Sequence, residues 1–270
     1  MVEPIFYFKL ENSKIFSVIV ETLNSIIDEC IIDVSSDELQ INAMDPSRIC
    51  LIRLTMKQEN FDVYTCKNSE KIGLNLDDLT KILKRSNNKD ILEFGYYKKD
   101  SKIRMQFCQE GQTRKRTFSL ATIDTEQEDI PMENLLSIEY PSTFDMDTDI
   151  ISEALKDAEI YSEILNMKAD EENGIFFSSS GQIGEMEYDL SIEDLIESEI
   201  TGISNGAYSL LFLKSILKIS SITERLEVSL KTDHPLKMIF SILEGSELSY
   251  FLAPRCEDAD FVNDEELDEF

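Results

Sequence analysis

The stretch DDLTKILKRS, residues 77–86, decides the fold, because AYSLLFLKSILKIS, residues 207–220, repeats its pattern. The first stretch opens with acidic residues and closes with basic ones, which is the charge order that an α-helix favours. Apolar and basic positions of the two stretches coincide at an offset of 133 residues; the pairs are Leu79 with Phe212, Lys81 with Lys214, Leu83 with Ile216 and Arg85 with Lys218. Two helices that match in this way indicate a chain built from two copies of one module.

Further elements repeat on both sides of this helix pair. Residues 13–29 and 149–163 carry apolar residues at helical spacing, and each predicts the first helix of its half. Alternating apolar residues predict half-buried strands at offsets of 132 to 135; the matched sets are Leu92, Phe94 and Tyr96 with Leu226, Val228 and Leu230, Ile103, Met105 and Phe107 with Met238, Phe240 and Ile242, and Phe118 and Leu120 with Tyr250 and Leu252. Each half therefore has the order helix, strands, helix, strands, so we expect the α+β fold class with two similar domains.

The repeat also suggests where the domains end. We expect an N-terminal domain at 1–121 and a C-terminal domain at 143–256. Residues 122–142 are acidic, contain two prolines and lack a sustained period, which is typical of a linker. Residues 257–270 hold eight acidic residues and no basic one, and we expect a disordered tail.

Composition excludes several classes of function. The chain has 270 residues, 26 Lys and Arg against 54 Asp and Glu, and a formal net charge of −28, so DNA could be contacted only through a local basic patch. The single histidine, His234, excludes multi-histidine metal sites, and without GxSxG it does not suggest a Ser-His-Asp triad. Phosphate loops and GxGxxG are absent. We therefore assign no catalytic residue, metal or cofactor.

Targeting signals are also missing. The first residues lack the basic and apolar regions of a signal peptide, and no apolar run is long enough to span a membrane. The five cysteines are widely spaced and form no CxxC, which favours reduced thiols in an intracellular protein. We expect a cytoplasmic protein, or a nuclear one in a nucleated cell.

The bases of the second helices stand out against this acidic background. Lys81, Lys84 and Arg85 share one helix face, and so do Lys214 and Lys218. An ordinary solvated face is the alternative explanation. However, bases at matching positions of a repeat would face one common side, which suits sequence-independent contact with a long polyanion.

Two short strands have opposite charge. Arg114, Lys115 and Arg116 precede residues 117–120, whereas Glu185, Glu187 and Asp189 alternate with Met186, Tyr188 and Leu190. If both are sheet edges, their complementarity predicts a head-to-tail contact between copies, which can close into a ring. Two ordinary charged edge strands are the alternative.

Specific stretches resemble the sliding clamp family, proliferating cell nuclear antigen (PCNA), and most closely its archaeal-type members. These stretches are AMDPSRICLIRL (43–54), IGLNLDDLTKILKR (72–85), RTFSLATID (116–124), EALKDAEIYSE (153–163) and YFLAPR (250–255). The resemblance covers roughly residues 5–256. It implies two DNA-clamp domains per chain and a ring of three protomers, with helices lining the hole and strands outside. Duplex DNA would pass through the ring, and the clamp would tether DNA polymerase and so raise processivity.

The resemblance also implies functional residues and partners. The DNA-facing residues would be Lys14, Lys81, Lys84, Arg85, Lys156, Lys214 and Lys218. A pocket for client peptides that carry a glutamine and apolar anchors (PIP box) would be formed by Met44, Arg48, Ile49, Ile130, Pro235, Phe251, Ala253 and Pro254. The subunit interface would include Arg114, Lys115, Arg116, Phe118, Glu185, Glu187, Tyr188 and Asp189. Partners would be a clamp loader of the replication factor C type, DNA polymerase, flap endonuclease, DNA ligase and identical or related clamp subunits.

The chain departs from the family pattern, and other functions remain open. Glu128 stands where relatives usually carry an apolar linker residue, and the acidic tail is longer than usual. An acidic interaction protein, such as a histone chaperone or DNA mimic, would explain the net charge but not the paired basic helices. A carboxylate enzyme could use Asp77 with Asp78, or Glu185 with Glu187, but neighbours on a strand or helix point apart.

Overall fold

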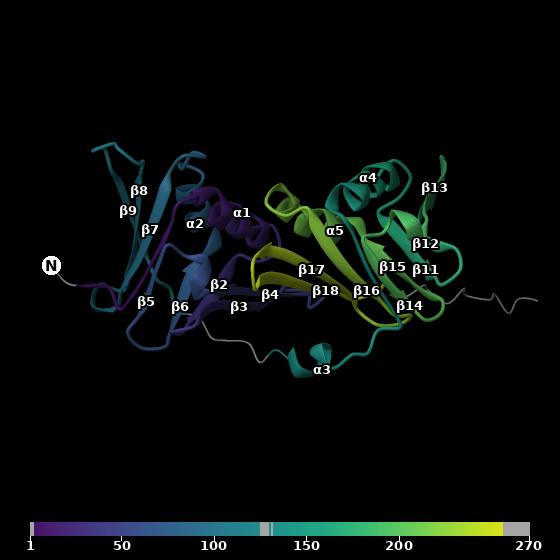
Figure 1. Ribbon diagram of the computed structural model, residues 1–270, viewed down its shortest axis with the longest axis horizontal. Coiled ribbons are helices and arrows are strands. Elements are labelled where there is room, and N and C mark those ends of the chain that lie inside the picture. The colour runs from purple at the N-terminus through teal and green to yellow at the C-terminus, as the bar shows by residue number, and fades with distance from the viewer. Residues whose placement is uncertain (1–2, 125–129, 131, 256–270) are drawn as a thin grey trace, which may run out of the picture.

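The computed structural model describes residues 3–124, 130 and 132–255, which form two α+β units side by side (Figure 1). The first unit comprises β1 (Phe6–Leu10), α1 (Ser13–Asn24), β2 (Glu29–Val34), β3 (Glu38–Met44), β4 (Cys50–Lys57), β5 (Val63–Cys66), β6 (Glu70–Asn75), α2 (Leu76–Leu83), β7 (Ile91–Tyr97), β8 (Lys102–Cys108) and β9 (Arg116–Ala121). The second comprises β10 (Ser142–Asp147), α4 (Thr148–Ala158), β11 (Ile164–Asp170), β12 (Gly174–Gly181), β13 (Gly184–Leu190), β14 (Glu197–Ile200), β15 (Ser204–Ser209), α5 (Leu210–Ile216), β16 (Arg225–Leu230), β17 (Leu236–Leu243) and β18 (Ser246–Leu252). The predicted α+β class with two similar units is confirmed. Glu128 and the tail 257–270 lie outside the described residues.

The connecting segment contains a short helix that the sequence did not predict. This helix, α3 (Met132–Leu136), lies on the opposite side of the sheets from α1, α2, α4 and α5 (Figure 1). None of the helices in the described part of the chain is long and apolar enough to cross a membrane.

The strands form three sheets, one of which runs through both units. The five-stranded sheet has the order β5-β1-β7-β8-β9, and the four-stranded sheet has the order β13-β12-β11-β15. The nine-stranded sheet has the order β14-β10-β16-β17-β18-β4-β3-β2-β6. Its centre is the antiparallel pair of β18 with β4, in which Tyr250 faces Ile52 and Leu248 faces Leu54. We call this pair the closed joint. It leaves β9 and β13 as sheet edges, as the sequence predicted for these two strands.

Local capping sets the helix boundaries, which differ from the predicted ones. The side chain of Asn75 accepts a hydrogen bond from the Asp78 N–H (3.0 Å), so α2 starts at residue 76 and not 77. In the second half, residues 207–209 still belong to β15, and the helical stretch divides into α5 and the 3₁₀-helix η4 (Leu217–Ser221). The first helices end earlier than predicted, at residues 24 and 158.

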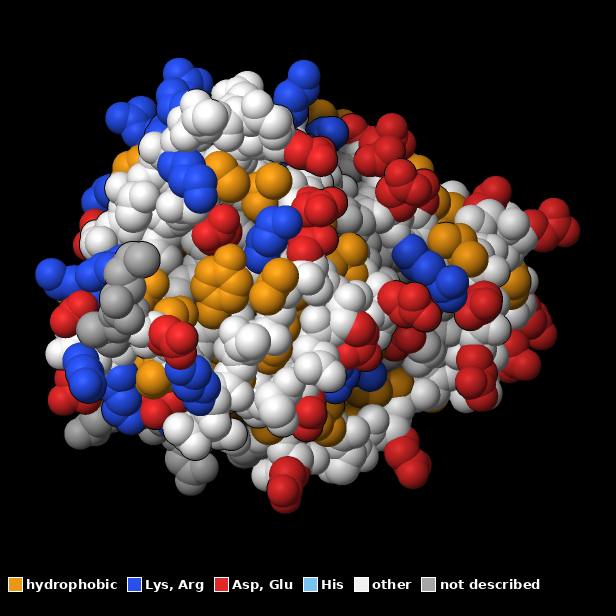
Figure 2. Space-filling view, turned by 60° about the vertical axis from the view of Figure 1, so that its left-hand side comes forward, with side chains coloured by type: hydrophobic (Ala, Val, Ile, Leu, Met, Phe, Trp, Pro, Cys, Tyr) orange, Lys and Arg blue, Asp and Glu red, His pale blue; other side chains and the backbone are white. Residues whose placement is uncertain are grey.

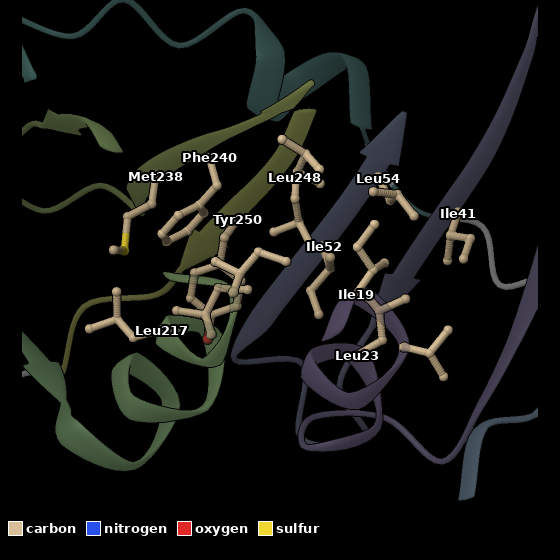
Figure 3. Close-up of a cluster of buried hydrophobic side chains, with 14 of the residues drawn as sticks. Ile19, Leu23, Ile41, Ile52, Leu54, Leu217, Met238, Phe240, Leu248 and Tyr250 are labelled. Carbon is tan, nitrogen blue, oxygen red and sulfur yellow. The ribbon is translucent and has the colours of Figure 1, made fainter. Parts of the chain in front are cut away.

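One apolar core runs under the closed joint. Figure 3 shows Ile19 and Leu23 of α1 beside side chains of β3 and β4 and of the second unit; the labelled residues are Ile41, Ile52, Leu54, Leu217, Met238, Phe240, Leu248 and Tyr250. Ile52, Leu54, Leu248 and Tyr250 have no exposed surface. The two units are therefore held together by a desolvated interior, and the closed joint is a permanent part of the fold.

The internal repeat has a slightly different register from the predicted one. The N-caps of α2 and α5 are Asn75 and Ser209, an offset of 134, so Lys84 matches Lys218. Strand pairing also matches Met105 with Met238, because these residues face Phe118 and Tyr250 respectively. The predicted offsets of 133 for the helices and 135 for these strands were wrong. A slip of two residues keeps every strand side chain on the same face, so alternation alone could not reveal that error.

Candidate functional surfaces

The candidate DNA-facing bases lie on the helix side of the molecule. Lys81, Lys84 and Arg85 are exposed at the end of α2, and Lys214 and Lys218 are exposed on α5 and η4. Lys156 is exposed on α4, whereas Lys14 is half-buried at the start of α1. The four long helices occupy one side of the sheets (Figure 1). The structure thus brings these seven residues to one side of a single chain.

Three of these lysines already have acidic partners. The Nζ atom of Lys81 lies 2.7 Å from Asp77 and 3.1 Å from Asp78, Lys84 lies 3.0 Å from Glu21, and Lys214 lies 2.6 Å from Glu159. Hydrogen bonds that Lys81 donates to the carboxylates of Asp77 and Asp78 raise the pKa of Lys81, so this ammonium stays charged. A phosphate would have to replace these partners, which weakens any contact with a nucleic acid.

The first helix of the second unit presents mainly acids. Asp149, Glu153 and Asp157 are exposed on α4 around the single base Lys156. Figure 2, in which the first unit faces the viewer, shows basic side chains spread over that unit and acidic ones gathered towards the right, over the second. The cationic character of the helix side is therefore uneven.

Most residues expected for the peptide pocket lie around the end of β3 and the closed joint. Leu51 of β4 faces Met44 on one side and Phe251 of β18 on the other. The Asp45 carboxylate shapes the following loop by accepting the N–H groups of Ser47, Ile49 and Cys50 at 2.9, 2.6 and 2.6 Å. Arg48 adopts a positive φ of 58° in this loop.

Further contacts tie the C-terminal segment to the same place. The Ala253 N–H donates to the Ile49 carbonyl (2.9 Å), and the Tyr140 hydroxyl donates to the Pro235 carbonyl (2.9 Å). Ile49 is 38% exposed, whereas Phe251 is only 2% exposed and serves mainly as packing. Ile130 is half-buried. Pro254 instead lines a hollow of about 950 Å³ in the second unit, together with Arg255, Phe176 and Asp189.

The edge strands β9 and β13 carry the predicted charges, with one important exception. Arg114, Lys115, Glu185, Glu187 and Asp189 are exposed. Arg116 instead forms an ion pair with Asp90, which is buried, and donates to the Arg85 carbonyl at 2.6 Å. Its main role within the chain is to neutralise a buried carboxylate. The sequence offered no signal for this pair, because its partners are 26 residues apart.

Backbone contact fixes the position of β13. A Cβ atom at Gly181 would lie 1.9 Å from the carbonyl oxygen of Tyr161, so only glycine allows this close approach. The turn between β12 and β13 is thereby pressed against the end of α4.

The chain is similar to known proteins at the levels of family, sequence and structure. The family model "Proliferating cell nuclear antigen, N-terminal domain" matches residues 5–129, and the corresponding C-terminal model matches residues 134–255. The "DNA polymerase sliding clamp" of Thermococcus fumicolans is 31% identical over 255 residues, covering 94% of this chain and 99% of the relative. That of Thermofilum pendens is 31% identical over 253 residues, covering 93% and 99%.

Solved structures agree with these matches. The crystal structure of PCNA from Thermococcus kodakaraensis superposes with a TM-score of 0.84 at 24% identity, covering 93% of this chain and 100% of the other. A chain of the PCNA2–PCNA3 complex from Sulfolobus tokodaii gives the same TM-score at 26% identity and the same coverage.

Proposed function

Because the chain belongs to the proliferating cell nuclear antigen family of DNA polymerase sliding clamps, we propose that its helix side lines the hole of a three-protomer ring around duplex DNA. A sliding clamp encircles DNA and tethers the polymerase, which raises processivity. The family assignment leaves the acidic interaction protein without support. The chain itself needs no catalytic site, because topology and not chemistry retains it on DNA.

The observation that carries this proposal is the placement of the bases. Exposed Lys81, Lys84, Arg85, Lys214 and Lys218 share the helix side, in a chain with twice as many acids as bases. The ion pairs of Lys81, Lys84 and Lys214 with neighbouring carboxylates would keep the phosphate contacts of these three lysines weak and exchangeable. Weak contacts of this kind suit a ring that slides and does not bind one sequence.

The remaining surfaces suit the partners of a clamp. The surface around Met44, Ile49 and Ala253 would offer an apolar place for a client peptide. Clients would include DNA polymerase, flap endonuclease and DNA ligase, and an ATP-driven loader would open the ring. The free edges β9 and β13 would join protomers. The clamp would work in the cytoplasm on chromosomal DNA, or in the nucleus of a nucleated cell.

Charge reversal tests the proposed lining. We expect a variant with Lys81, Lys84, Lys214 and Lys218 changed to Glu to lose loading onto circular DNA and processive synthesis, while its affinity for a client peptide is unchanged. The matched control changes Lys67, Lys71, Lys98 and Lys99 to Glu, which alters the net charge equally away from the long helices. Equal losses for both variants would contradict the assignment.

A peptide titration tests the pocket separately. Changing the exposed Ile49 and the half-buried Ile130 to Ala should weaken binding of a glutamine-containing client peptide by about 1–3 kcal/mol if they are anchors. The amount of clamp that the loader places on circular DNA should not change. Unaltered peptide affinity would place the pocket elsewhere.

A further inference from the structure

We propose that the free edge of β14 is a docking site for an extended, basic segment of a partner protein, which adds to the nine-stranded sheet as a further strand. β14 ends this sheet on the side away from the first unit (Figure 1). Four strand spacings, about 19 Å, separate it from β18 and from the surface expected for client peptides. The inference therefore goes beyond the proposed function and names a second site.

The backbone of β14 has unused hydrogen-bonding groups on one side. In the part of the chain that the structure describes, β14 pairs only with β10, in an antiparallel ladder. Beside this ladder the Thr201 N–H donates to the Pro141 carbonyl (2.9 Å). Because hydrogen-bonded and non-hydrogen-bonded pairs alternate, the N–H and C=O groups of Ser198 and Ile200 point away from β10. They are available to another strand.

Three exposed isoleucines surround this edge. Ile192 is 38% exposed, Ile196 is 53% exposed and Ile203 is 64% exposed. Ile192 begins the 3₁₀-helix η3 (Ile192–Asp194), Ile196 directly precedes β14, and Ile203 lies between β14 and β15. Apolar side chains around an unpaired strand edge promote pairing with other chains, and proteins usually avoid this combination. Its presence here indicates a surface that a partner covers.

The first unit has polar residues at the matching positions. There the Phe61 N–H donates to the Gln58 carbonyl (3.2 Å) in the 3₁₀-helix η1 (Gln58–Asn60). In the second unit the Leu195 N–H donates to the Ile192 carbonyl (3.2 Å), so η1 and η3 correspond. The matching pairs, at an offset of 134 residues, are Gln58 with Ile192, Asp62 with Ile196 and Ser69 with Ile203. The fold therefore does not require isoleucine at these positions.

The first unit also covers this end of its core with aromatic rings that the second unit lacks. Tyr64 of β5 packs on Phe61, with 5.1 Å between ring centroids, and donates its hydroxyl to the Ser35 carbonyl (3.0 Å). The residue that corresponds to Tyr64 is the exposed Ser198. Leu195, which corresponds to the buried Phe61, remains partly exposed. An added strand with apolar side chains would complete the cover of the second core.

The charges of the edge determine the chemistry of the partner. Glu197 and Glu199 alternate with Ser198 and Ile200, so both carboxylates lie on the face away from the core. Glu197 pairs with Arg225 (2.9 Å), whereas no ion pair of Glu199 is seen among the described residues. A second copy of β14 would be repelled, and so would a nucleic acid. The edge suits a strand in which apolar side chains alternate with lysine or arginine.

A synthetic strand provides the test on the full chain. The probe is a fluorescent peptide of about eight residues in which valine and lysine alternate. We expect it to bind, and to slow hydrogen exchange of the Ser198 and Ile200 amides. A peptide with the same residues in two blocks, four valines and then four lysines, cannot place both kinds of side chain correctly. It should bind about tenfold more weakly or worse, and so should a peptide of alternating valine and glutamate.

Two variants locate the binding. Ile196→Asp/Ile203→Ser gives the second unit the residues of the first and should weaken binding of the alternating peptide about tenfold or more, with circular dichroism unchanged. Glu199→Lys should have a similar effect, because it reverses a charge on the edge. Val63→Asp removes an exposed side chain from β5, the matching strand of the first unit, and should leave the affinity unchanged. Glu244→Lys in an exposed turn is the control for net charge.

Each other outcome counts against the inference. An alternating peptide that does not bind at about 1 mM would overturn it. Equal affinity for the block peptide would mean that charge alone attracts these peptides and that no strand is added. Equal losses in Val63→Asp or Glu244→Lys would place the binding elsewhere. If the double variant loses its circular dichroism, Glu199→Lys and the hydrogen exchange of Ser198 and Ile200 decide the question.

Discussion

The two units share one fold but differ sharply in charge and in the composition of their cores. Residues 1–121 contain 18 Lys and Arg and 18 Asp and Glu, whereas residues 143–256 contain 8 and 22. The cores differ as well, because the first unit packs Phe8 on Phe94 and the second packs Phe144 beside Val228. Buried apolar side chains at matching strand positions are thus enough to give both units the same fold, even when the side chains differ in size. The surface charges of the two units can therefore differ without changing the fold.

The division of charge suits a clamp. In the proposed ring, the neutral first unit would supply four of the seven candidate lining bases, and the acidic second unit would discourage DNA from binding outside the hole. It also makes the two edges of the proposed ring contact unlike, since β9 belongs to the neutral unit and β13 to the acidic one. A single charge distribution would therefore serve both DNA exclusion and the direction of assembly in the proposed ring.

The largest predicted effect is on the free energy of unfolding, when matching core residues of the two units are changed to alanine. Phe94 is fully buried, and its ring stacks on Phe8 at 4.8 Å. Phe94→Ala should lower the free energy of unfolding by about 3–5 kcal/mol. Val228→Ala, at the matching position of the second unit, removes fewer atoms and should cost about 2 kcal/mol. Urea denaturation followed by circular dichroism would measure both, and equal losses would show that the aromatic cluster adds nothing special.

The sequence was a good guide to this fold wherever side chains alternate between core and solvent. The rows through Phe94 and Val228 could be predicted because burial imposes a period of two. The start of α5 could not, because residues 207–209 are apolar enough for either a strand or a helix. The exact residue offsets between matching elements of the two units could be determined only from their backbone hydrogen-bond partners, because hydrophobic periodicity does not specify those partners.

The candidate site was predictable in part for a similar reason. Basic positions on helix faces follow from spacing, and the structure places them on one side. The ion pairs of Lys84 with Glu21 and of Arg116 with Asp90 join elements distant in sequence. Only the packing of those elements brings the charges together, so sequence reasoning had no access to them.

The next largest effect on stability should come from the buried carboxylate of Asp90, because the residue at the matching position of the second unit is exposed. Asp90 is 2% exposed and accepts hydrogen bonds from Asn87, Gln109 and Arg116. Its counterpart in the second unit is the exposed Glu224. Arg116→Ala should lower the free energy of unfolding by about 2–3 kcal/mol, because it leaves a buried carboxylate without its cation.

A neighbouring base supplies the control for that measurement. Arg114→Ala removes the same charge from an exposed position two residues earlier, and should change stability by less than about 0.5 kcal/mol. A comparable loss for both variants would mean that Asp90 does not depend on Arg116. The same reasoning makes Lys115, and not Arg116, the informative residue for assembly.

A smaller effect should separate two lysines at matching positions. Lys84 pairs with Glu21, whereas no ion pair of Lys218 is seen among the described residues. Lys218 can therefore meet a phosphate without giving up a partner, and Lys218→Ala should weaken duplex binding two- to threefold more than Lys84→Ala. The logarithmic salt slope should fall by about 0.9 for Lys218→Ala and by less for Lys84→Ala. Fluorescence anisotropy at several salt concentrations would show both, and a larger change for Lys84→Ala would reverse the assignment.

The smallest effect concerns a carboxyl of the acidic unit. Burial is the main cause that raises the pKa of Glu227, with the charges of Asp145 and Glu247 adding to it against the opposing Lys237 and Arg225. A carboxyl whose pKa is higher in the folded than in the unfolded state binds more protons when folded. Its contribution to stability is therefore complete below the unfolded pKa and declines as the pH rises through the folded pKa.

Glu227→Gln removes this dependence, and so tests whether crowding of acids has a cost for the second unit. The variant should match the wild type near pH 3 and exceed its free energy of unfolding by about 0.5 kcal/mol at pH 7, a modest gain because the carboxyl is still partly in water. Urea denaturation across this pH range would measure the difference. Glu244→Gln makes the same change of charge in an exposed turn and is the control. The opposite result would be a wild type whose free energy of unfolding rises relative to that of Glu227→Gln as the pH increases. It would mean that the attraction of Lys237 outweighs the effect of burial on the pKa of Glu227, and that the surplus of acidic residues does not destabilise the second unit at this position.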